Sequence, residues 1–85
     1  MSEQVVLSEF DERMAHFAHV RALILKIVNV RSGLTVSEIT EQFRMSYGFT
    51  PIIDNRLREL RKLGDVKAVK EEDGLLHIYP NKEEK

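Results

Sequence analysis

The sequence has 85 residues, of which 42% are hydrophobic and 32% are charged. This length allows one small core, and the composition is that of a globular chain, neither a disordered one nor a membrane one. The longest apolar runs reach three or four residues, whereas a membrane-spanning helix needs about 20. Cysteine is absent, which excludes disulfides, thiolate zinc sites and cysteine nucleophiles. We therefore expect a cytoplasmic protein without a signal peptide or a membrane segment.

The charge is unevenly distributed, although the net charge is only −1. Residues 51–70 carry six Lys or Arg against three acids, and residues 14–50 carry four against two. Both ends of the chain, residues 1–13 and 71–85, are acidic. Local patches, more than net charge, determine where a polyanion binds. The basic middle of the chain is therefore the candidate binding region.

The first long element follows a tail, residues 1–7, that is loose or at best a short strand. Ser8 can cap a helix, and no proline or glycine interrupts the chain from there to Asn29. Arg21 lies within the apolar arc of this segment, so either the helix breaks there, or Arg21 extends along its stem or pairs with an acid. Apolar residues at steps of three and four predict one long helix; they are Phe10, Met14, Phe17, Val20, Ile24, Ile27 and Val28.

A short second helix is predicted over residues 36–44. Thr35 and Glu38 form a capping box, in which the two side chains reciprocally satisfy free backbone amides. The next five residues are expected to form a turn with two aromatic side chains. Phe49 is predicted to act as a hydrophobic staple against the start of the third helix or a neighbour. Tyr47 either donates to a phosphate or packs against the protein, and the pattern leaves both open.

A third helix is predicted over residues 51–62. Thr50 is a suitable cap, Pro51 suits the first helical position, and Gly64 is typical of a helix end. The spacing of its aliphatic residues predicts one inward ridge, formed by Ile53, Leu57 and Leu60.

The end of the domain is predicted to be a β-hairpin. Residues 66–70 and 75–79 are β-prone, and the connection between them ends in Asp73-Gly74, which is a hairpin signal. Three helices followed by a two-stranded hairpin give an α+β fold in one domain of residues 8–80. Residues 81–85 are predicted to form a polar tail.

Three segments carry a resemblance to a known family. They are Leu34–Ile39 at the second helix, Arg56–Gly64 at the third, and Asp73-Gly74 in the hairpin. With them the chain resembles a winged helix-turn-helix domain, as in small regulators of bacteria, phages and plasmids. The resemblance implies that the third helix enters the major groove of double-stranded DNA and that the hairpin is a wing.

The resemblance also implies which residues meet DNA. The base-facing positions would be Thr50, Asp54, Asn55 and Arg58, and the phosphate-facing positions Arg56, Arg61 and Lys62. An ordinary solvated helix face is the alternative, because exposed helices are commonly rich in Arg, Lys and Glu, and surface pairs contribute little.

The hairpin departs from this picture. Lys67 and Lys70 are further phosphate candidates, but Glu71–Asp73 at the tip are three consecutive acids. Phosphates would repel them, so we expect the tip to be solvated or turned toward a protein partner.

The remaining polar residues do not assemble a reactive site. His16 and His19 lie three apart with Glu12 one turn before, but no fourth ligand is near in the sequence, so we expect surface histidines. His77 is expected to point across the hairpin. Neither a glycine-rich phosphate loop nor a nucleophile motif is present. We expect neither an enzyme nor a protein with a metal or cofactor.

The first helix is longer than the domain needs, and its surplus turns carry Phe10, Met14 and Phe17. Because a small domain has little room for them, they predict a homodimer interface, with intramolecular packing as the alternative. The sequence thus favours a DNA-binding transcriptional regulator. The alternative is a winged-helix module for protein interactions without DNA affinity, which the acidic tip and acidic ends suggest.

Overall fold

In the computed structural model the described part of the chain is residues 9–81, with side chains from residue 11 onwards. The predicted tails, residues 1–7 and 81–85, lie outside the described residues except for Asn81. The backbone and side-chain amides of Asn81 donate to the carbonyls of Asp65 and Gly64, at 3.0 and 3.1 Å, so it belongs to the folded domain. The elements are α1 (Glu9–Val30), β1 (Leu34–Thr35), α2 (Val36–Tyr47), α3 (Ile53–Leu63), β2 (Val66–Lys70) and β3 (Leu76–Pro80).

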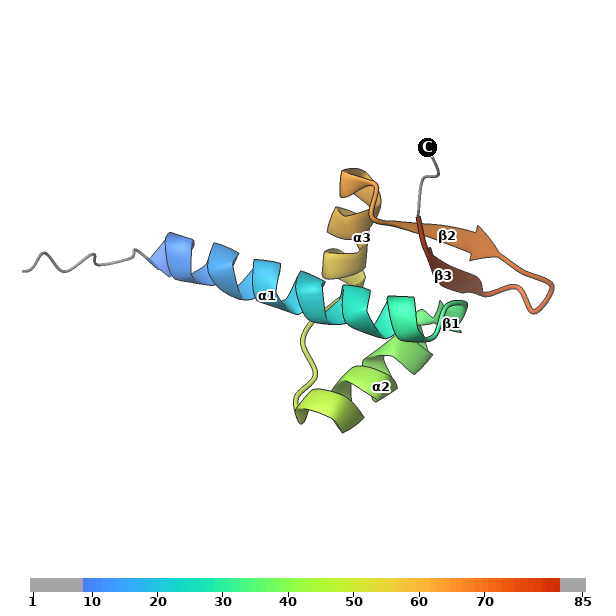
Figure 1. Cartoon of the computed structure of the whole chain (residues 1–85), viewed down its shortest axis with the longest axis horizontal. Helices are drawn as coiled ribbons and strands as arrows, with labels where there is room; N and C mark the ends of the chain where they lie inside the picture. Colours follow the sequence, from blue (N-terminus) through green and yellow to red (C-terminus); the bar gives the residue numbers. More distant parts are fainter. Residues whose placement is uncertain (1–8, 82–85) are drawn as a thin grey trace, which may run out of the picture.

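α1 is one continuous helix of 22 residues, which is about 33 Å long. Arg21, where a break was conceivable, instead donates from Nη1 to Oε1 of Glu59 on α3 at 2.7 Å. The C-terminal half of α1 carries the buried Val20, Ile24 and Val28 and lies across α2 and α3. Its first turns project beyond both of these helices (Figure 1).

α2 begins as predicted and ends later than predicted. The hydroxyl of Thr35 accepts from the amide of Glu38 at 3.2 Å, and the Glu38 carboxylate accepts from the amide of Thr35 at 2.9 Å, which confirms the capping box. The helix continues through Tyr47 to Gly48, which has a left-handed φ of 80°. The predicted turn was therefore placed too early. Glycine, which lacks a Cβ, adopts the left-handed conformation of a helix end without strain.

α3 begins later than predicted. Thr50 and Pro51 precede the helix, and Ile52, at φ −76° and ψ 102°, is its extended N-cap residue. The prediction of a threonine cap with proline in the first helical position is wrong, because the chain uses these residues to pass from α2 to α3. Ile53 is the first helical residue and is buried. The predicted helix end is confirmed: Gly64 is left-handed, with φ 84°.

The strands form an antiparallel sheet in the order β1-β3-β2. β2 and β3 are the predicted hairpin. β1 adds two pairs, Leu34 opposite Ile78 and Thr35 opposite His77. The prediction of a two-stranded sheet is therefore wrong in strand number. A strand of two residues has no alternating pattern to detect, and only its position beside β3 makes it one.

The core lies where the three helices meet the sheet. Its enclosed side chains include Ile24, Ile39, Phe43 and Leu60, one or more from each helix. The protein is thus a mixed α+β fold of three helices and a three-stranded antiparallel sheet. Within residues 9–81, every helix is too short or too polar to cross a membrane.

Candidate nucleic-acid interface

α3 has a buried ridge and an exposed face. Ile53, Leu57 and Leu60 are buried, as their spacing of four and three predicts. The polar residues turned away from this ridge are exposed; they are Asp54, Asn55, Arg58, Arg61 and Lys62. The aliphatic ridge therefore orients α3 and determines which of its cations face solvent.

Arg56 does not belong to this exposed face. It is only 8% exposed, and its guanidinium carbon lies 3.6 Å from the ring centroid of Phe17 on α1. Its Nε and Nη2 donate to the two carboxylate oxygens of Glu59, at 2.8 and 2.7 Å. The prediction of a phosphate contact for Arg56 is therefore corrected, because all of its strong interactions are within the protein.

Glu59 joins α1 to α3. Besides Arg56, its carboxylate accepts from Arg21 of α1 at 2.7 Å. The hydrogen bond from Arg56 lowers the pKa of Glu59 most; burial opposes this, and Arg21 adds to the lowering. The sequence left the role of Arg21 open, and the structure shows the acid-paired alternative. Glu59 is thus turned to α1 and away from the exposed cations, whereas Asp54, the other acid of α3, is exposed.

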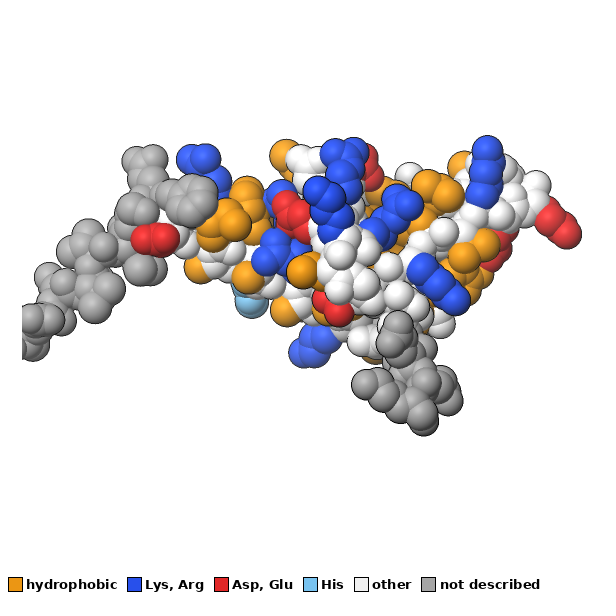
Figure 2. All heavy atoms as spheres, turned by 90° about the horizontal axis from the view of Figure 1, so that it is seen from above, with side chains coloured by type: hydrophobic (Ala, Val, Ile, Leu, Met, Phe, Trp, Pro, Cys, Tyr) orange, Lys and Arg blue, Asp and Glu red, His pale blue; other side chains and the backbone are white. Residues whose placement is uncertain are grey.

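Arg58, Arg61 and Lys62 are the exposed cations of α3. Within the described part of the chain, none of the three forms an ion pair or a side-chain hydrogen bond. Figure 2 shows Lys and Arg side chains gathered over α3. Asp54 and Asn55 share the first turns of the same face. The face therefore carries three cations that form no ion pair within residues 9–81, together with the acid Asp54.

A groove of about 160 Å³ separates α3 from the hairpin. Arg58 and Arg61 line its helical side, and Ala68 of β2 lines its strand side. Side chains alternate along a strand, so Lys70 shares the face of Ala68, whereas Lys67 lies on the other face of the sheet. Of the two predicted wing cations, Lys70 is therefore the one on the sheet face that borders the groove, at the end of β2 next to the acidic tip.

The acidic tip is bound into the fold. The imidazole Nε2 of His77 lies 2.8 Å from Oδ2 of Asp73, and its Nδ1 lies 2.6 Å from the carbonyl oxygen of Gly33. Both neighbours are acceptors, so this geometry favours the protonated ring, in which both nitrogens donate. The Gly33 carbonyl, then the Asp73 carboxylate, raise the pKa of His77. His77, expected to point across the hairpin, links the tip to the turn before β1.

A second acid of the tip, Glu71, also forms a hydrogen bond within the fold. The hydroxyl of Tyr79 donates to the carboxylate of Glu71. This bond raises the pKa of Tyr79. Glu72, between the two bound acids, is exposed. The hydroxyl of Tyr79 is neutral, so only a protonated His77, 2.8 Å from Asp73 and 3.8 Å from Glu71, would offset part of the charge of the tip.

The aromatic residues at the end of α2 and just after it pack together. Tyr47 and Phe49 both meet Phe43 edge-on, with ring centroids 4.9 and 5.2 Å away. This supports packing for both, and the neighbour that Phe49 contacts is Phe43. Tyr47 lines a crease between α1 and α2. Thr50, a predicted base contact, is exposed in the connection before α3.

The predicted dimer residues lie in different environments. Met14 is 43% exposed on the projecting part of α1. Phe17 is half-buried beneath Arg56, so its packing is at least partly intramolecular. The side chain of Phe10 lies outside the described residues. The apolar surface available for a dimer is therefore smaller than the sequence indicates. Across residues 11–81, no group of three His, Asp or Glu could hold a metal ion.

No protein-family model matches this chain, and no curated protein gives a significant match. The function is therefore inferred from the geometry of the exposed groups.

Proposed function

We propose that this fold is a winged helix-turn-helix and that it binds double-stranded DNA as a transcriptional regulator. The observation that carries the proposal is the outer face of α3. Arg58, Arg61 and Lys62 are exposed there without an acidic partner among residues 9–81, opposite a buried aliphatic ridge. A row of unpaired cations on a helix is the electrostatic footprint that DNA-binding helices share.

The order of residues along α3 suggests how the contacts divide. Asn55 lies in the first turn and Arg58 in the middle of the helix. An asparagine can contact adenine and an arginine guanine through paired hydrogen bonds in the major groove, which is about 12 Å wide and admits a helix. Arg61 and Lys62, in the last turn, would contact phosphates. Asp54 would discourage a phosphate near the helix start.

The hairpin would contribute through Lys70, the last residue of β2 before the acidic tip. Lys70 shares the sheet face that borders the groove beside α3, so it can meet the same DNA backbone as Arg61. Glu72, at the tip, would be repelled by phosphate and limits how deeply the wing enters a groove. With Arg56 buried and Lys67 on the other sheet face, about three or four phosphate contacts remain for each protein chain. The log–log salt slope should then be roughly −3 to −4.

A mobility-shift titration against pooled random duplexes tests the proposal. Affinity should fall about a hundredfold between about 50 and 200 mM salt. The R58A/R61A double variant should lose most of this affinity. R44A is a matched control, because Arg44 is an exposed arginine of α2 that is paired with Glu41. Absence of salt-sensitive binding, or equal effects of the two variants, would refute DNA binding through α3.

A protein-interaction module is the second candidate function. Leu75, at the hairpin turn, is 53% exposed, and Leu76 beside it is also exposed. Both line a mainly apolar hollow with Val36 at the start of α2. Such a surface beside the acidic Glu72 suits a partner with apolar and basic side chains. In that case L75S would abolish partner binding and the R58A/R61A variant would not.

A further inference from the structure

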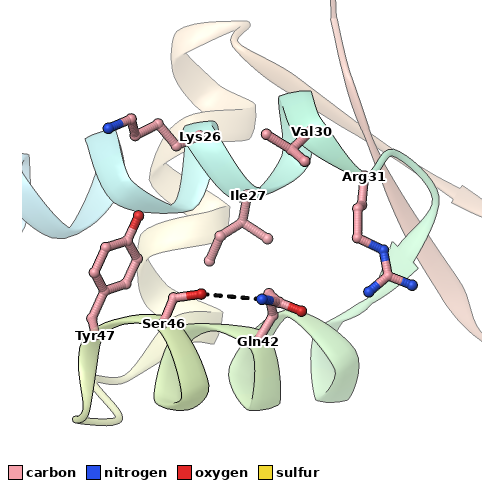
Figure 3. Close-up of a pocket in the computed structure, with 7 residues that line it drawn as sticks. All are labelled: Lys26, Ile27, Val30, Arg31, Gln42, Ser46 and Tyr47. Carbon is pink, nitrogen blue, oxygen red and sulfur yellow. Dashed lines mark hydrogen bonds between the residues drawn. The ribbon is translucent and has the colours of Figure 1, made fainter.

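A crease lies between the C-terminal halves of α1 and α2, away from the residues proposed to meet DNA (Figure 3). We propose that it binds a small amphipathic carboxylate, whose apolar body rests on Ile27 and Val30 and whose carboxylate pairs with Arg31. This inference does not depend on the proposed DNA binding, since the two sites share no residue.

The floor of the crease is apolar. Ile27 is buried beneath it, and Val30 is 81% exposed at its upper wall. The ring of Tyr47 closes one end; Figure 3 shows it rising from α2 toward α1. A valine exposed this fully, beside an apolar floor, leaves surface that an aliphatic ligand can cover.

The charged groups of the crease have one sign. Lys26 and Arg31 stand at its two ends, and the other residues that line it within the described chain are uncharged. Neither cation forms an ion pair with any residue of the described range. The surface therefore attracts anions at both ends, and an amphiphile with a cationic head is disfavoured.

Arg31 is the better partner for the carboxylate. Figure 3 shows its guanidinium extending from the end of α1 toward Gln42 of α2. A guanidinium presents two parallel N–H donors that match a carboxylate, whereas the Lys26 ammonium is a point charge. The amide of Gln42 donates to the hydroxyl of Ser46 at 3.1 Å, and this bond forms the polar lower rim.

The size of the crease restricts the ligand. Its volume of about 220 Å³ is below the range of about 300–1,000 Å³ that drug-sized ligands occupy. A helix or strand of another protein would not fit within it. A fatty or aromatic acid with a short apolar body would fit.

The test is an NMR titration of the whole chain with octanoate and with octylammonium, which share an apolar body and differ in the sign of the head. Octanoate should shift the signals of Ile27, Val30, Gln42 and Ser46 saturably, and octylammonium should not. Equal shifts with both compounds, no saturable shift, or shifts centred on the exposed Leu75 would overturn the proposal.

Two variants sharpen the test. R31Q should weaken octanoate binding about fivefold to tenfold, because a charge-assisted pair is lost. The matched control is K70Q, which removes an exposed cation from the hairpin and should leave octanoate binding unchanged. S46W, at an exposed position of α2, should fill the crease and abolish saturable binding. Octanoate affinity that is equal in R31Q and K70Q, or retained in S46W, would contradict the assignment.

Discussion

Arg56 and Arg58 lie two residues apart on α3 and have opposite environments. Arg56 is buried on Phe17 and bound by both oxygens of Glu59, whereas Arg58 is exposed beside the hairpin groove. Two residues correspond to a rotation of about 200° around a helix, so the two side chains leave α3 in nearly opposite directions. The identity of the residue is the same; what differs is whether another element supplies a counterion and an aromatic face.

The largest expected effect follows from removing the buried member of this pair. R56A should lower the free energy of unfolding by about 2 kcal/mol, because it uncovers Phe17 and deprives Glu59 of two hydrogen bonds. R58A should change it by less than about 0.5 kcal/mol, as surface substitutions usually do. Urea denaturation at constant ionic strength measures both.

A third substitution separates charge from geometry at this site. R56K keeps the positive charge but loses the planar fork that binds both oxygens of Glu59, so its stability should lie between those of R56A and the wild type. If R56A and R58A have the same free energy of unfolding, the different environments of the two arginines do not affect the stability of the protein.

The next effect concerns DNA. R58A should weaken binding to a selected duplex about tenfold, which is about 1.4 kcal/mol and lies within the range of one base contact. R44A, whose arginine pairs with Glu41 on α2, should bind like the wild type. Fluorescence anisotropy with the selected duplex and a scrambled one measures the difference. Equal losses on both duplexes would move Arg58 from base contact to phosphate contact.

A smaller effect distinguishes the two lysines of the hairpin. Lys70 lies on the sheet face that borders α3, and Lys67 lies on the other face, opposite Tyr79. K70A should reduce the magnitude of the salt slope by about 1, and K67A should leave it unchanged. Anisotropy titrations at several salt concentrations give the slopes. A larger change for K67A would place the DNA on the other side of the hairpin.

The smallest effect concerns His77, whose ring the fold holds between the Gly33 carbonyl and Asp73. Its pKa is raised, chiefly by the Gly33 carbonyl and then by Asp73. The stabilisation is therefore complete below the ordinary histidine pKa of about 6.5 and is lost as pH rises through the higher folded-state value. The melting temperature should fall over that interval, and H77Q should remove the fall. A wild-type profile that is flat or rises would show that the ring is neutral.

Much of this arrangement was predictable because it is local. The capping box of Thr35 and Glu38 and the glycine end of α3 depend on residues within one helical turn, and the ridge of Ile53, Leu57 and Leu60 depends on the helical period. The start of α3 was predicted wrongly, since a Thr-Pro pair fits an extended connection as well as a helix start.

The candidate interface was predictable only in part. Period alone places Arg58 and Arg61 opposite the ridge, and both are exposed. The same period predicts that Arg56 is accessible to DNA, because the residue that covers it, Phe17, lies some forty residues earlier in the chain. No sequence pattern marks a contact over such a separation. The unexplained position of Arg21 within an apolar arc was the one signal that an acid of another element lay nearby.

The amino-acid order by itself determined the helices, the hairpin and the inward ridge of α3, because these follow from periodicity, caps and turns within a few residues. Tertiary structure alone decided which cations are free and that Leu34 and Thr35 form a third strand. Arg56 is buried against α1, whereas no other element covers Arg58, which stays exposed. The reason is physical. A cationic side chain is neutralised by any acid that the packing of the fold brings within about 4 Å, and this packing depends on the whole chain.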